Sequence, residues 1–509
     1  MKSKSIITLL FLMIGFFSCD EEILYPINPE QLGIETFYRT GPQLEAAVNS
    51  VYAGLQANNL YNREYFFLQD LLSDDTDTGG PQLEGSRAQV LNHVFDASNP
   101  LVTANWRGWY RILHRANLVL ENAPNATEEI TNTQRNRIVA EAHFLRALAN
   151  FELVSLWGPI PLMAASATTP DGLARSSEQE VYQLIFSDLQ TAISGLPLKS
   201  ELTGANTGRA SRGAAQALAA KAHLFRGDFA AAKPLLQAVI SSGQYSLVDR
   251  FLDNFEEENE NNSESVWEVQ FTEEFGDAGG WSGDGSGIAE VTFRGQEYGP
   301  NAWRNVIPSL GLITEFESVA GGAQKNDPRG TYSFFRIGDS FNNGLSVLSA
   351  GDVQGNIARP SWRKYQMIYK RPNEDTRSGI NFRVIRYADV LVMMAEAENE
   401  TVGPASALQY INQVRSRADV AMPPYPTAQY PTSTQAEMRR AIQHERRVEF
   451  AGEQIRNRDI RRWRRQKVLP SEPISVFKDY NDLLPIPQEE IDNNSGLTGA
   501  DQNKGYTAE

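Results

Sequence analysis

Cys19 is the only cysteine of the sequence, and it lies at the end of an apolar N-terminal segment. Lys2 and Lys4 precede this segment, and the small residue Ser18 stands directly before the cysteine. A positive start, a short apolar run and a small residue at its end are typical of a secretory signal peptide. A cysteine at the cleavage point further predicts a lipoprotein, in which the thiol is acylated and anchors the mature chain to a membrane.

This prediction divides the N-terminal region into two parts. Residues 1–18 form the lipoprotein signal peptide, and residues 19–40, with Pro26 and Pro29, form an extended lipid-anchored tether. The apolar run Ile6–Phe17 is too short to span the roughly 30 Å hydrocarbon core of a membrane as a helix. An ordinary signal peptide with an incidental cysteine is the alternative.

Common motifs for enzymatic catalysis are missing from the sequence. It has no His-Glu-x-x-His zinc motif, no Gly-x-Ser-x-Gly elbow and no phosphate loop ending in Gly-Lys-Ser or Gly-Lys-Thr. Acylation of the single cysteine excludes thiol catalysis. These motifs therefore indicate no enzyme class, and we predict that the protein needs no metal or other cofactor. Asp74, Asp75 and Asp77 leave a surface calcium as an alternative, although the glutamate expected at the twelfth position of a calcium loop is absent.

Composition and charge narrow the class of protein. A hydrophobic content of 41% is typical of a folded globular chain. The net charge of −16 argues against nucleic acid as a partner, because phosphate binding requires a positive surface. The same charge fits a surface protein that is kept soluble by self-repulsion.

Apolar residues at spacings of three and four predict a mainly α-helical fold in two blocks, 41–245 and 384–467. The region 246–383 is irregular, with short strands such as Trp267–Phe271, and 468–509 is rich in loops. We interpret 41–509 as a single domain. The expected helices cover about 41–55, 106–120, 133–156, 177–195, 211–226, 228–242, 384–401, 404–418, 434–450 and 453–466.

The pair 211–226 and 228–242 is rich in alanine and is joined by the short turn Gly227-Asp228. Small side chains let two antiparallel helices approach closely, as in tetratricopeptide-type pairs. The period is not strict enough to predict a regular array, so we expect diverged helix pairs that pack side by side.

Seven motifs in order resemble the SusD/RagB family of Bacteroidetes outer-membrane lipoproteins. They are Trp106-x-x-x-Tyr110-x-x-Leu113-x-x-Ala116-Asn117, Ala140-Glu141-Ala142-x-Phe144-Leu145-Arg146-Ala147 with Leu156-Trp157-Gly158-x-Ile160-Pro161-Leu162, Ala217-Leu218-Ala219-Ala220-Lys221-Ala222, Arg386-Tyr387-Ala388-Asp389-Val390-Leu391, Ile411-Asn412-x-Val414-Arg415-x-Arg417-Ala418, Glu445-Arg446-Arg447-x-Glu449-Phe450 with Arg456-x-x-Asp459-Ile460-x-Arg462-Trp463, and Leu484-Pro485-Ile486-Pro487-x-x-Glu490-Ile491.

The resemblance implies a non-enzymatic lipoprotein on the cell surface, anchored in the outer membrane. Such proteins cover a SusC-like TonB-dependent transporter as a hinged lid. They bind an oligosaccharide or polysaccharide, or in some members a peptide, and deliver it to the transporter. Asp20-Glu21-Glu22 resembles the acidic export tag that directs such lipoproteins to the outer face of that membrane. The implied fold is largely helical, with an irregular ligand-binding side.

Aromatic side chains in the irregular region are the candidates for a sugar-binding platform. Aromatic rings stack on the apolar face of a sugar ring, and loops hold such platforms at the surface. Four candidates stand among Gly, Asn, Arg and Ser residues: Trp281, Tyr298, Trp303 and Trp362. Packing that only anchors the loops is the alternative for each. Trp106, Trp109, Trp157 and Trp463 follow helical periodicity and are expected in the core, and Trp267 is expected to be half-buried.

The resemblance also implies that the loop at about 74–100 contributes polar contacts. Arg87 and Asn92 are the main candidates there, and Asp75, Asp77 and His93 are further ones. Charges of alternating sign at Arg415, Arg417 and along 445–462 predict ion pairs between packed helices. A basic docking patch at 453–467 is the alternative.

Three functions remain open at this point. The chain binds a glycan, binds a peptide with the same architecture, or, much less favoured, is a secreted glycosidase. A neutral β-glucan, a fructan and an acidic polymer all fit the sequence. The cations that an acidic polymer would need are available in the irregular region at Arg294, Arg304, Arg359, Arg363 and Lys364.

Overall fold

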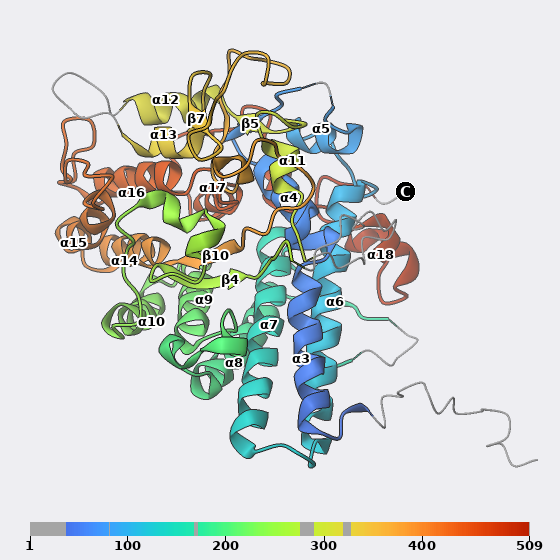
Figure 1. The fold of residues 1–509 in the computed structure, drawn as a ribbon. Coiled ribbons are helices and arrows are strands. Elements are labelled where there is room, and N and C mark those ends of the chain that lie inside the picture. The colour runs from blue at the N-terminus through green and yellow to red at the C-terminus, as the bar shows by residue number, and fades with distance from the viewer. Residues whose placement is uncertain (1–36, 81, 167–171, 275–289, 319–326, 508–509) are drawn as a thin grey trace, which may run out of the picture.

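The computed structural model describes residues 37–80, 82–166, 172–274, 290–318 and 327–507 (Figure 1). The predicted signal peptide, Cys19 and Trp281 lie outside the described residues. Folded structure begins slightly before the predicted boundary, because Tyr38 is buried and Thr40 pairs with Glu128. No helix in the described ranges is both long and apolar enough to cross a membrane.

The first helical block forms as predicted, except that its second long helix begins earlier, at Pro100. Thr40 and Ser177 cap the first turns of two helices, each in a capping box with the residue three positions later. Gly158, with a positive φ of 72°, ends the longest helix directly before Pro159. The helices of this block are α3 (Gly41–Leu55), α6 (Pro100–Asn122), α7 (Asn132–Trp157), α8 (Glu178–Gly195), α9 (Arg212–Phe225) and α10 (Phe229–Ser241).

The alanine-rich pair α9 and α10 is an antiparallel hairpin, as predicted. Ala217, Ala220 and Ala232 are fully buried, which brings the two helices close together. Gly227 adopts a φ of 75° in the turn, a conformation that favours glycine. Helix α10 then packs on α14 of the second block, so the two blocks form one helical scaffold (Figure 1).

The second helical block also agrees with the prediction. Its helices are α14 (Tyr387–Thr401), α15 (Pro404–Arg415), α16 (Gln435–Glu449) and α17 (Arg456–Arg465). The fold is therefore mainly α-helical, with tetratricopeptide-like pairs.

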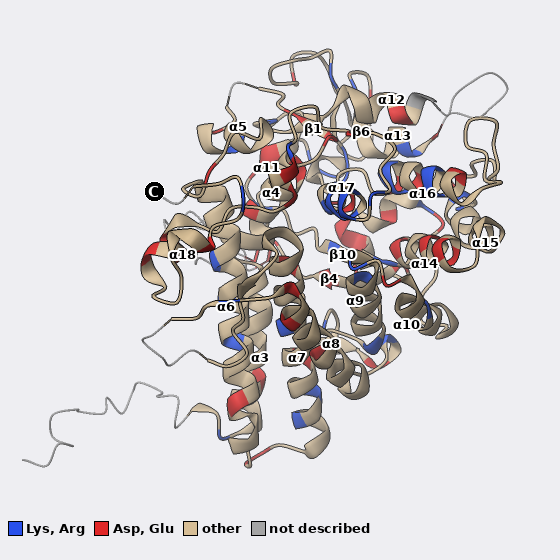
Figure 2. Cartoon of the chain, turned by 180° about the vertical axis from the view of Figure 1, so that it is seen from behind, with Lys and Arg blue, Asp and Glu red and all other residues tan. Residues whose placement is uncertain are grey.

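Oppositely charged side chains meet inside the molecule around α16, where Figure 2 shows red and blue segments together. Glu449 accepts from Arg386 at 2.8 Å and from Arg417 at 2.9 Å, and Glu445 accepts from Arg415 at 2.8 Å. Arg329 bridges the two glutamates at 2.6 and 2.8 Å. The predicted ion pairing between packed helices is confirmed.

The alternative of a basic docking patch at 453–467 is wrong. Arg458, Arg461 and Arg462 are buried, because the strongly basic helix α17 lies inside the molecule rather than on its surface. Arg458 pairs with Glu152 of α7, and Arg462 pairs with Glu396 of α14. These cations hold helices together and are not presented to a partner.

The region 246–383 contains short elements, and its central pair of strands, β4 and β10, crosses the middle of the molecule (Figure 1). These strands pair antiparallel, with Trp267 opposite Ile385. Trp267 is fully rather than half buried, since α7 covers it through Phe144. The elements are β4 (Ser265–Val269), α11 (Arg294–Tyr298), β5 (Ile307–Pro308), α12 (Leu310–Ser318), α13 (Arg329–Ser333), β6 (Phe334–Phe335), β7 (Ser340–Phe341), β8 (Ser346–Val347), β9 (Ser361–Trp362) and β10 (Phe382–Arg386).

Several short elements were not predicted. Helix α5 lies within the stretch that we expected to be a loop, and α18 lies within the C-terminal region. Besides short 3-10 turns, the unpredicted elements outside 246–383 are the π-helix η3 (Asn58–Asn62), α4 (Glu64–Leu71), β1 (Thr76–Asp77), α5 (Gly85–Leu91), β2 (Ile160–Pro161), β3 (Arg175–Ser176) and α18 (Gln488–Asn493).

The C-terminal region packs back on the first helical block. The Trp157 indole nitrogen donates to the Pro485 carbonyl at 2.9 Å, and the Asn503 amide donates to the Trp157 carbonyl at 2.9 Å. The Trp106 indole donates to Glu490 of α18 at 3.1 Å. Trp106, Trp109, Trp157 and Trp463 all lie in the core, as predicted.

Candidate functional site

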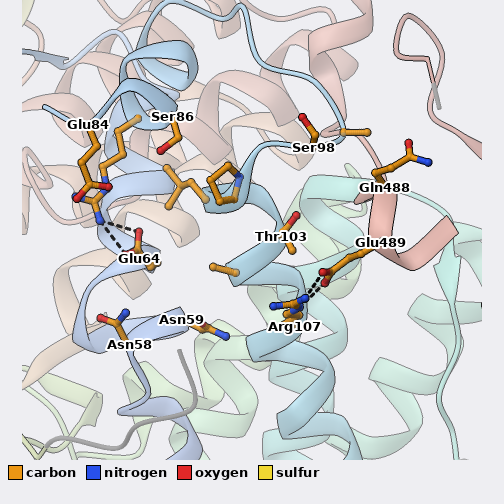
Figure 3. A pocket seen from close by; sticks show the side chains of 15 residues that line it. Asn58, Asn59, Glu64, Glu84, Ser86, Ser98, Thr103, Arg107, Gln488 and Glu489 are labelled. Atoms are coloured by element: carbon orange, nitrogen blue, oxygen red, sulfur yellow. Dashed lines mark hydrogen bonds and ion pairs between the residues drawn. The ribbon is translucent and has the colours of Figure 1, made fainter. Parts of the chain in front are cut away.

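A cavity of about 510 Å³ opens between η3, α5, the first half of α6 and the start of α18 (Figure 3). We call it the α5 cleft. Its walls carry mainly amide, hydroxyl and charged groups: Asn58, Asn59, Glu64, Glu84, Ser86, Arg87, Ser98, Thr103, Arg107, Gln488 and Glu489, with Ala97, Pro100, Leu101 and Ala104 between them.

Arg87 fixes α5 against α4 and forms one side of the α5 cleft. Its guanidinium donates to Glu64 at 2.8 Å and to Glu84 at 3.2 Å, and it lies 3.8 Å above the ring centre of Phe67. Burial raises the pKa of Glu64, although the two neighbouring arginines, Arg87 and Arg63, favour its charged form. Arg87 lines the cleft but is 2% exposed and is already paired within the protein, so its role as a ligand contact stays a prediction.

Asn59 provides an unsatisfied donor at the α5 cleft. It belongs to η3, is 3% exposed, and its amide nitrogen has no hydrogen-bond partner. Figure 3 shows this nitrogen on the side facing Arg107. A buried donor without a partner costs about 1–3 kcal/mol. A ligand oxygen in the cleft would therefore satisfy a group that the protein leaves open.

The opposite wall joins segments that are far apart in the sequence. Arg107 of α6 and Glu489 of α18 form a two-pronged ion pair across the cleft (Figure 3). The backbone of Gln488 donates to the Ala97 carbonyl at 2.9 Å, which holds α18 beside the 97–104 segment. Both cations of the cleft, Arg87 and Arg107, are thus paired within the protein.

The structure places two of the predicted aromatic platforms in the core, and for them the prediction is wrong. Tyr298 is fully buried and donates to Asp70 at 2.9 Å. Trp362 is fully buried beside Phe334, at a ring-centre distance of 5.7 Å. Both side chains turn inward because α11 and β9 are ordered elements within a stretch whose sequence resembles loops.

For Trp303 and Asn92, the role in ligand binding stays a prediction. Trp303 is half-buried, and its backbone carbonyl lies beside Gly80. A Cβ at that glycine would stand 3.4 Å from the carbonyl oxygen. It thus borders the segment that leads into α5. Asn92 is exposed directly after α5, and its side-chain amide donates to the Ala88 carbonyl at 2.7 Å. His93 is buried rather than exposed for contact.

The cations expected for an acidic polymer are mostly unavailable in this part of the molecule. Arg294 donates to the Gly452 carbonyl and to Gln454, Arg304 to backbone carbonyls of 354–360, and Lys364 to Glu453. All three donors are buried. Their charges hold loops in place and do not reach a ligand.

The carboxylates considered for calcium are also paired. Asp74 contacts Arg456 at 2.7 Å, and Asp75 contacts Arg447 at 2.8 Å. Within the ranges that the structure describes, no group of three or more His, Cys, Asp or Glu side chains is placed to hold a metal ion.

Sequence reasoning did not identify Asn58, Asn59 or Gln488. The pair Asn58-Asn59 directly after a helix is a signal that could have marked a polar turn. Gln488 gives no local signal, because it reaches the α5 cleft only through the return of the C-terminal region onto α6.

Comparison with known proteins assigns the chain to a family. A model described as SusD family matches residues 263–506, and a second, described as starch-binding associating with outer membrane, matches residues 35–224. The chain is a SusD-like protein and belongs to the SusD/RagB family, as the resemblance of its motifs predicted.

Relatives and solved structures agree with this assignment over nearly the full length. SusD-like protein P25 of Formosa agariphila is 29% identical, covering 99% of this chain and 100% of the relative. A SusD-like protein of Bacteroides ovatus is 24% identical, covering 94% of this chain and 85% of the relative. A SusD superfamily protein of Bacteroides vulgatus has a TM-score of 0.77 at 24% identity, over 92% of this chain and 100% of that one. A laminarin-binding SusD-like protein has a TM-score of 0.74 at 25% identity, also over 92% of this chain and 100% of that one.

Proposed function

We propose that the protein binds an oligosaccharide or polysaccharide in the α5 cleft and has no catalytic activity. In this proposal it is a lipoprotein on the surface of the outer membrane and passes the glycan to a SusC-like TonB-dependent transporter. The observation that carries the binding role is the α5 cleft itself, a hydroxyl- and amide-lined cavity with the unsatisfied Asn59 donor, in a chain of SusD family membership.

The α5 cleft favours a neutral glycan over an acidic one. Its two arginines are paired, while the Glu84 side chain at its edge is half exposed. Carboxylate, amide and hydroxyl groups exchange hydrogen bonds with sugar hydroxyls, whereas an anionic ligand would meet this glutamate. Laminarin binding by a similar structure supports including β-glucans among the ligands tested.

Isothermal titration with a panel of laminarin, a fructan, a neutral xylan and alginate tests the binding role. We expect a neutral member to bind, and Asn59→Ala to weaken that binding by about tenfold, because a hydrogen bond to a desolvated group is lost. Asn132→Ala, at the far end of α7, is the matched control and should bind like the wild type. We expect Trp303→Ala and Trp281→Ala to weaken binding as well if these rings complete the platform.

The same panel distinguishes the alternatives. Failure to bind any glycan, with binding of extended peptides instead, would replace the glycan proposal by the peptide-binding one. Release of reducing sugar from a panel member would contradict the non-catalytic role.

A further inference from the structure

A second cavity, of about 610 Å³, opens beside α16, on the other side of the loop-rich half from α5 (Figure 1). We call it the α16 cavity. One face of α16 supplies four donors at helical spacing, Arg440, Gln443, His444 and Arg447. The other walls come from α12 with Glu315, from Tyr430, and from the partly apolar segment Leu469, Pro470, Ser471 and Pro473.

The carboxylates of this cavity are already occupied by the protein. Both Asp74 oxygens accept from Arg456, at 2.7 and 3.0 Å, and one also contacts Arg447 at 2.9 Å. Behind the wall, Asp75 accepts from Arg447 at 2.8 Å. Glu315 accepts from Tyr430 at 3.2 Å and contacts the Nδ1 of His444. The acceptors in the α16 cavity therefore have little capacity left for a ligand.

Two nitrogen groups, in contrast, remain open. Arg440 is exposed and has no ion-pair or hydrogen-bond partner among the described residues. His444 is 4% exposed, and its Nε2 has no partner, whereas its ring stacks on Tyr430 at 4.2 Å and its Nδ1 faces Glu315. A guanidinium has only donors, and a histidine ring nitrogen can donate or accept a hydrogen bond.

We propose that the α16 cavity is a separate binding site for a carboxylate-bearing sugar unit, a uronate. The carboxylate would pair with Arg440 and reach the Nε2 of His444, since charge-assisted bonds to arginine suit this group. The sugar ring would lie against Leu469 and the neighbouring prolines. This site extends the proposed function, because its ligand class differs from the neutral glycan expected in the α5 cleft.

Calorimetric titration with trigalacturonate and with the neutral galactose trisaccharide tests this proposal. The wild type should bind the acidic probe at least about tenfold more tightly than the neutral one. Arg440→Gln should weaken binding of the acidic probe by about tenfold. Ser471→Trp, at an exposed position of the wall, should block the cavity and abolish binding. Lys467→Gln removes a nearby surface charge outside the cavity, and it should change the affinity by less than about twofold.

Other outcomes would overturn the proposal. It fails if the acidic probe does not bind, if both trisaccharides bind equally, or if Arg440→Gln and Ser471→Trp bind like the wild type. Loss of uronate binding in Asn59→Ala, with Arg440→Gln unaffected, would assign the ligand to the α5 cleft instead. Neutral-glycan binding that persists in Arg440→Gln shows that the function of the α5 cleft is intact. Thermal melting of each variant checks that its fold is unchanged.

Discussion

His93 is the clearest case of a side chain whose chemistry is set by burial. It follows α5 with a positive φ of 54°, and its Nδ1 is buried without a partner. Burial and, to a lesser extent, the nearby positive charge of Arg461 together lower its pKa to about 4. The imidazole is therefore neutral in the folded protein at pH 7 and serves packing against Phe477 rather than ligand contact.

This shift predicts a loss of stability on mild acidification. The unfolded chain, with a histidine pKa near 6.5, binds a proton before the folded protein does, so the free energy of unfolding falls as pH falls from about 6.5 to 4, by up to about 3 kcal/mol. In urea unfolding at pH 7 and pH 4.5, the wild type should lose roughly 2 kcal/mol more than His93→Asn, since asparagine tolerates the positive φ and does not titrate. An equal loss in the free energy of unfolding in the two proteins would contradict the lowered pKa of His93.

At the scale of elements, α16 is the helix on which the packing of the second block depends. Glu445 and Glu449 lie one turn apart on its buried face, and they receive Arg329, Arg386, Arg415 and Arg417 from three other segments. Although burial disfavours its charged form, Arg329 and Arg415 lower the pKa of Glu445 to about 2. Burial also disfavours the charged form of Glu449, but Arg386, Arg417 and Arg329 lower its pKa, so both glutamates stay ionised at neutral pH.

Removing one charge from this cluster should be costly. Glu449→Gln leaves buried arginines without their counter-charge, and we expect a loss of about 3–5 kcal/mol in the free energy of unfolding at pH 7. Glu258→Gln removes an exposed partner of Lys370 and should cost less than about 1 kcal/mol. Urea unfolding of both variants measures these free energies. If Glu449→Gln lost as little free energy of unfolding as Glu258→Gln, the buried charge cluster would not be a determinant of stability.

At the scale of the whole molecule, the helical scaffold could be predicted because its signals are local. The stripe of α7 and its end at Gly158-Pro159 are visible in a single stretch of sequence, as are the small residues of α9 and α10. The burial of Tyr298 and Trp362 could not be predicted, since it depends on Asp70 and Phe334 from other segments. Helix α5 was missed because Gly85 and Ser86 open a short helix with weak periodicity.

The proposed anchor also belongs to this scale. Cys19→Ala should release the protein from the cell surface, because the acylated thiol would be its membrane attachment. Membrane fractionation and surface labelling of whole cells would measure this, with Ser18→Ala as a control that keeps the small residue before the cysteine. A variant that stays on the surface and still supports glycan uptake would rule out the lipid tether.

The Arg107–Glu489 pair has a consequence for biosynthesis. Its two partners are 382 positions apart, so most of the chain must be synthesised before the wall of the α5 cleft can close. Closing a contact of such long sequence separation costs chain entropy that local contacts do not cost. A nascent or prematurely terminated chain that lacks the segment after Leu484 would leave Trp157 uncovered and would have no α18 wall. If the α5 cleft binds the glycan as proposed, only molecules whose synthesis has reached the C-terminal region would capture it.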